Sequence, residues 1–131
     1  MKIKTKTKNN NYNMNLIYPY QYIKVLSPNL IRIGIHELLQ YKIKKDYQYD
    51  RNFVLKIKRV EKKILSEGIV ANLYNQELIT AYLFFSPYDG TIVNKNYKLI
   101  NNPRLILNNN ESDNWLFDIK TNFNYKYCTY S

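Results

Sequence analysis

The sequence predicts a mainly antiparallel β domain of many short strands with one or two short helices. Several segments alternate apolar and polar residues with a period of two, and turn signals with proline, asparagine or glycine separate them. The 131 residues are enough for one domain, and 45% are hydrophobic, which supplies a core. The longest apolar run, residues 78–85, is far shorter than a bilayer span.

The expected strands follow from these patterns. In order they are 22–26, 30–35, 53–58, 69–73, 78–85, 91–93 and 115–120. The two strands on either side of residues 74–77 read as a hairpin with its tip at those residues. Gly34 interrupts its strand, which indicates a bulge or close packing.

Two short helical segments are expected between the strands. Residues 36–43 have apolar side chains at mixed helical spacing and predict a short helix or irregular turn, followed by a charged loop over 44–52. Residues 94–100 predict one or two helical turns. They end at Asn101-Asn102-Pro103 because the residue before a proline is pushed out of the helical region.

Composition divides the chain into three parts. Residues 1–16 are rich in lysine and asparagine, contain no acid, and predict a flexible basic arm or the remnant of a targeting peptide. Residues 17–121 are the β domain, and residues 122–131 are a polar, tyrosine-rich tail.

The formal net charge is +10, from 20 basic against 10 acidic residues. Such a chain is attracted to polyanions, whether nucleic acid, anionic lipid or acidic protein surfaces. The favoured interpretation of the charge is an ordinary solvated surface, because the composition is skewed toward the residues of AT-rich codons. No RNA-recognition strand signature, zinc finger or glycine-lysine loop is present.

Side chains able to carry chemistry are few and scattered, so no enzymatic activity and no metal are expected. His36 is the single histidine and Cys128 the single cysteine, which leaves no metal-ligand spacing and no disulfide framework. Two acidic pairs are expected in loops, solvated or paired with lysine: Asp46 with Asp50, and Glu111 with Asp113. Four aromatic residues are expected in the core rather than on a base-stacking platform: Tyr82, Phe84, Phe85 and Trp115.

An ordered series of short motifs occupies the second half of the chain. They are Ser86-Pro87-Tyr88-Asp89-Gly90, Thr91-Ile92-Val93-Asn94, Asn102-Pro103, Leu105-Ile106 and Asp113-Asn114-Trp115-Leu116. In that order and spacing the series resembles the second half of a glycine cleavage system H-protein. The first half agrees more loosely through Ile33-Gly34-Ile35, Gln40, Ile43, Tyr18, Tyr22 and Val25, with residues 44–52 as a short insertion.

The resemblance covers roughly residues 18–120 and implies a barrel-sandwich hybrid, the lipoyl and H-protein fold. Members of that family present one lysine on a hairpin tip. Lipoic acid is attached there through an amide to the lysine Nε, and it swings between partner enzymes. The resemblance therefore implies a carrier rather than a catalyst.

One position departs from the family in a way that affects function. The family's Glu-Ser-Val-Lys falls on Gln76-Glu77-Leu78-Ile79, so Ile79 occupies the lipoyl-lysine position. No lysine or arginine lies between Lys63 and Lys95. An isoleucine has no nitrogen to acylate, so we expect no lipoyl group and no other cofactor. The expected docking tip is Asn75, Gln76, Glu77, Leu78 and Ile79.

The leading hypothesis is a degenerate, non-catalytic H-protein-like module. It would dock to glycine cleavage or lipoylation enzymes, or be a subunit of a larger assembly, in the mitochondrion of a eukaryote or otherwise in the cytoplasm. The first alternative is a basic RNA-binding or ribosome-associated β protein. The second is a functional carrier whose lysine stands elsewhere in the chain.

Overall fold

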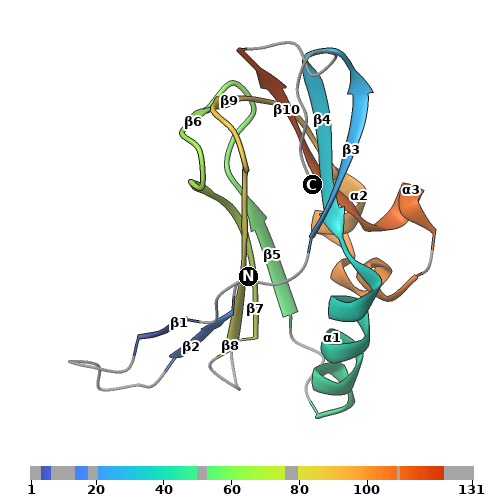
Figure 1. Ribbon diagram of the computed structural model, residues 1–131. Coiled ribbons are helices and arrows are strands. Elements are labelled where there is room, and N and C mark those ends of the chain that lie inside the picture. Colours follow the sequence, from blue (N-terminus) through green and yellow to red (C-terminus); the bar gives the residue numbers. More distant parts are fainter. Residues whose placement is uncertain are drawn as a thin grey trace.

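The computed structural model describes residues 4–6, 14–17, 21–49, 53–75, 80–108 and 110–122, which form two five-stranded sheets (Figure 1). In spatial order the first sheet contains β1 (Lys4–Lys6), β2 (Met14–Ile17), β8 (Thr80–Phe85), β7 (Ile69–Asn75) and β5 (Phe53–Ile57). The second contains β3 (Gln21–Ser27), β4 (Leu30–Ile35), β10 (Trp115–Thr121), β9 (Gly90–Lys95) and β6 (Lys63–Ile64). The paired strands are antiparallel except β2 and β8, which are parallel.

The core consists of side chains that project from alternate positions of the strands. From the second sheet come Ile31, Ile33, Ile35, Phe117 and Ile119, and from the first come Leu55, Leu73, Tyr82 and Phe84, all buried. The predicted fold class, a mainly β barrel-sandwich architecture with short helices, is confirmed. The predicted core positions of Tyr82 and Phe84 are confirmed as well, whereas Phe85 is half-buried.

The helices lie together beside the lower part of the second sheet in Figure 1. They are α1 (Glu37–Tyr49), α2 (Tyr97–Asn101), the 3-10 helix η1 (Pro103–Leu107) and α3 (Glu111–Asn114). Helix α2 matches the predicted helical turns and begins at Asn96, whose side chain accepts a hydrogen bond from the Leu99 amide. The sequence patterns did not predict η1, α3 or the two-residue strand β6.

Helix α1 corrects the prediction of a charged loop over residues 44–52, because it continues to Tyr49. Leu39 and Ile43 are buried one turn apart and anchor the helix to the core. No glycine or proline lies between residues 37 and 52, and the lysine and glutamine residues of this segment are good helix formers. The helix therefore continues for more than a turn beyond the buried Ile43.

Gly34 permits a close approach, as its place within a strand predicts. Tyr22 lies on the paired strand β3, and its ring covers Gly34 of β4. A Cβ atom at Gly34 would overlap that ring. The backbone of Gly34 is not in the left-handed region, so the constraint is steric.

Trp115 was expected in the core, and that expectation is wrong. A bulge between Trp115 and Phe117 shifts the alternation of β10, so Trp115 is half-buried on the outer face of its sheet. There the Arg32 guanidinium stacks 3.9 Å from its ring centroid.

Strands β1 and β2 come from residues in and beside the range predicted as a basic arm. The division of the chain into an arm, a β domain and a tail stays a prediction.

Candidate functional site

The β7–β8 hairpin is the element to which the sequence assigns the docking tip. Its two strands are antiparallel, and the last residue pair of the ladder is Asn75 with Thr80. The connection is therefore made by residues 76–79. Of the predicted tip residues, Gln76, Glu77, Leu78 and Ile79 lie outside the described residues, and Asn75 ends β7.

The hairpin has a rigid base. It is central in its sheet, with β2 beside β8 and β5 beside β7. At the base Ser86 donates its amide to the Gly68 carbonyl, at 3.1 Å, and the Ser66 amide donates to Asp89 Oδ1, at 2.6 Å. The Ser-Pro-x-x-Gly turn therefore fixes the root of the hairpin against the preceding turn.

Lipoyl attachment needs a lysine on this hairpin, and the chain supplies none between residues 64 and 94. The flanking lysines belong to the other sheet. Lys63 is on β6 and pairs with Thr91, and Lys95 ends β9 with its ammonium donating to the Ile57 carbonyl at 3.3 Å. The side chains that the sequence provides here do not fit a lipoyl group.

His36 and Asp113 have structural partners. The Leu38 amide donates to His36 Nδ1, at 3.1 Å, at the start of α1. Asp113 accepts hydrogen bonds from Lys98 Nζ, at 2.7 Å, and Asn108 Nδ2, at 3.1 Å, and these hydrogen bonds lower the pKa of the Asp113 carboxyl. These two residues therefore fix helix ends.

Three acids of the two predicted pairs and the single cysteine were also candidates for chemistry. The Asp46 and Glu111 side chains, Asp50 and Cys128 lie outside what the structure describes. Within the described ranges, no group of three or more His, Cys, Asp or Glu side chains could hold a metal ion. None of the helices described there has the length and apolar character needed to cross a membrane.

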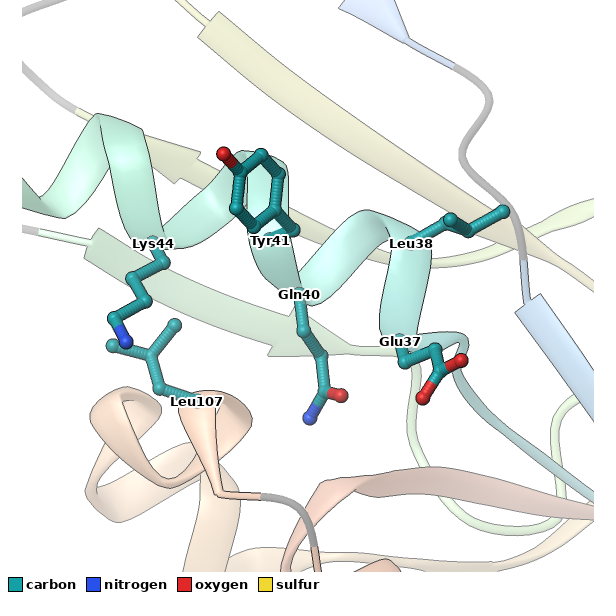
Figure 2. A pocket seen from close by; sticks show the side chains of 6 residues that line it. All are labelled: Glu37, Leu38, Gln40, Tyr41, Lys44 and Leu107. Carbon is teal, nitrogen blue, oxygen red and sulfur yellow. The ribbon is translucent and has the colours of Figure 1, made fainter.

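A pocket of about 460 Å³ lies between α1 and η1, and Figure 2 shows the side chains that line it. Gln40 forms its floor and is 8% exposed, and its Nε2 donates to the carbonyls of Ile106 and Asn108, both at 2.7 Å. The other lining residues are Glu37, Leu38, Tyr41, Lys44 and Leu107. This lining contains no nucleophile paired with a base, so it offers no catalytic pair.

The two sheets, the central hairpin and the fixed Ser-Pro-x-x-Gly turn define the barrel-sandwich fold of lipoyl domains and H-proteins. The family model of the glycine cleavage H-protein matches residues 12–126. The chain therefore belongs to the glycine cleavage H-protein family. That family is a lipoyl carrier rather than a catalyst.

A solved structure supports the fold independently. The crystal structure of a glycine cleavage system H protein from Mycobacterium marinum is similar, with a TM-score of 0.60 and 14% sequence identity over 80% of each chain. No curated protein matches the chain. At this identity the likeness shows the shared fold alone.

Proposed function

We propose that this chain is an H-protein-like module that has lost the lipoyl lysine and acts by docking to partner proteins or as a subunit of a larger assembly. The observation that carries the proposal is a hairpin of the H-protein type without an amine. The family match and the rigid base of the hairpin support retention of the scaffold, and the sequence from residue 64 to residue 94 supports loss of the attachment point.

Loss of the amine removes the carrier chemistry and leaves the binding surface. A lipoyl group is held by an amide to a lysine Nε, and the isoleucine at position 79 has only carbon and hydrogen in its side chain. Docking needs shape and polar complementarity, which a rigidly rooted hairpin retains without a prosthetic group. The partners that fit this proposal are glycine cleavage or lipoylation enzymes.

Intact-mass measurement after co-expression with a lipoate ligase tests the loss. We expect the native chain to show no added lipoyl group, while a lysine-bearing H-protein in the same cells is modified. The Ile79→Lys variant is the matched control, since it restores an amine at the assigned position and is expected to be lipoylated. A lipoylated native chain would contradict the proposal and establish the alternative of a carrier with its lysine elsewhere.

Docking is tested separately by affinity capture with purified glycine cleavage and lipoylation enzymes. We expect at least one of them to bind the native chain. A Glu77→Lys variant, which reverses the charge of the assigned tip, should weaken that binding, and Glu37→Lys on α1 makes the same change away from the hairpin. If neither variant nor native chain retains any of these enzymes, the docking role is refuted.

A further inference from the structure

The end of β5 brings cationic and aromatic side chains from both sheets together. Strand β5 is an edge strand, and the Ile57 carbonyl near its end accepts the Lys95 ammonium of β9. That ammonium lies 5.4 Å from the centroid of the Tyr97 ring. Across β5, the Lys56 ammonium lies 5.7 Å from the ring centroid of Tyr74 on β7.

We propose that this surface binds single-stranded nucleic acid, with its lysines and arginine on the phosphates and Tyr97 stacking on a base. We define the β5 surface by Lys56, Lys58, Arg59, Tyr74, Lys95 and Tyr97. This inference goes beyond the proposed docking function and does not depend on whether the chain carries lipoate.

The charge of the β5 surface is open to a ligand. Lys56, Lys58 and Arg59 are exposed, and none forms an ion pair with another described residue. The next two cations, Lys62 and Lys63, are exposed as well, and Glu61 is the single acid from residue 56 to residue 63. A cluster of this density attracts a polyanion in a salt-dependent way.

The backbone around these cations is held in place. The Glu61 amide donates to the Ile92 carbonyl, at 2.6 Å, and the Ile92 amide donates to the Lys62 carbonyl, at 3.0 Å. The Lys62 amide closes the turn on the Arg59 carbonyl, at 3.2 Å. A fixed turn loses little conformational entropy when its side chains bind a ligand.

The aromatic rings favour nucleic acid over an acidic protein segment. Tyr97 is 57% exposed and its ring centroid lies 5.4 Å from the Lys95 ammonium, so an exposed aromatic ring stands next to a positive charge. Bases stack on such rings whatever their sequence, and single strands present their bases for it. An acidic peptide would use the cations and gain little from the ring.

Fluorescence anisotropy with a labelled oligouridine, over about 50 to 200 mM salt, tests the proposal. We expect binding whose logarithmic salt slope is about −3 for four phosphate contacts. Tyr97→Ala should weaken binding about tenfold, whereas Tyr97→Phe keeps the ring and should bind as the native chain does. The triple variant Lys56→Gln, Lys58→Gln, Arg59→Gln should weaken binding at least tenfold and flatten the slope by about 2.

The matched control is the triple variant Lys42→Gln, Lys44→Gln, Lys45→Gln. It removes the same charge from α1, where Lys45 also lies near an exposed ring, that of Tyr41, at 4.7 Å. Near-native binding by this control supports a defined site. If both triple variants lost the same affinity for oligouridine, binding would depend on net charge alone, and the proposal would be overturned. The proposal would also be overturned if a glutamate-rich peptide bound more tightly than oligouridine and Tyr97→Ala left that peptide binding unchanged.

Discussion

The carboxylate of Asp118 holds the guanidinium of Arg32 through two hydrogen bonds on the outer face of the second sheet. Nε of Arg32 donates to Oδ1 at 2.8 Å, and an Nη donates to Oδ2 at 3.1 Å. The Asp118 side chain is 1% exposed and the Arg32 side chain 28%, so the carboxylate is removed from water while the guanidinium stays partly exposed. The hydrogen bond to Asp118 raises the pKa of Arg32, against the effect of partial burial.

Replacing Asp118 by asparagine should lower the free energy of unfolding by about 2 kcal/mol. An asparagine turns one acceptor into a donor that faces Arg32 or the Asn94 amide, and it leaves the guanidinium without its counter-charge. Urea unfolding measures the loss. Lys120→Gln is the control, since Lys120 is exposed on the same strand and should change the free energy by less than about 0.5 kcal/mol. A variant Asp118→Asn as stable as the native chain would contradict this prediction.

Gly34→Ala should lower the free energy of unfolding by about 1–3 kcal/mol, because the new methyl group would overlap the Tyr22 ring. The cause is tested by a double-mutant cycle with Tyr22→Ala. Once the ring is removed, the alanine at position 34 should cost much less. Additive effects of the two changes would show that the ring is not what limits residue 34.

Asn72→Val should raise the free energy of unfolding by about 1 kcal/mol. Asn72 Oδ1 is buried and has no hydrogen-bond partner in the part of the chain that the structure describes. Valine removes that acceptor and favours a strand. Thermal unfolding measures the effect. A lower melting temperature for the variant would show that the carboxamide has a stabilising partner.

Asp113 should make stability depend on pH in the acid range. Its pKa in the folded chain lies below the ordinary value of 3.8, since Lys98 and Asn108 donate hydrogen bonds to the carboxylate. The stabilisation is therefore present above pH 3.8 and is lost as the pH falls through the lower folded pKa. Urea midpoints of the native chain and of Asp113→Asn should differ at neutral pH and converge in acid. A difference that persists unchanged in acid would rule out the carboxylate as its source.

Strands such as β4 and β5 were predictable because one face of each is buried, which gives the sequence apolar residues at a period of two. Strand β4 coincides with its predicted range, and the prediction fails where the period is broken. The bulge before Phe117 turns Trp115 outward, and no local pattern marks it. The extent of α1 was missed because its later residues are polar, and β6 is too short to show a period.

The candidate sites differ in how far sequence alone could locate them. The hairpin was predicted from the two apolar strands on either side of residues 74–77. Strand β7 starts at the predicted Ile69, and β8 ends at the predicted Phe85. The β5 surface could not be found in this way. It depends on Lys95 reaching the Ile57 carbonyl, 38 residues away along the chain, and on Tyr97 following Lys95 into the start of α2. Such contacts exist only after the two sheets pack.

Strand β5 starts beside the far end of the hairpin, where Phe53 pairs with Asn75, and runs away from it to Ile57. At about 3.3 Å per residue, these four steps separate the two ends by about 13 Å. Under the two proposals, a protein partner would contact the Asn75 end of β5 and the phosphates of an oligonucleotide would contact Lys58 and Arg59 beyond its other end. Tyr74 lies beside the first end, so the two ligands would be close neighbours along a single strand.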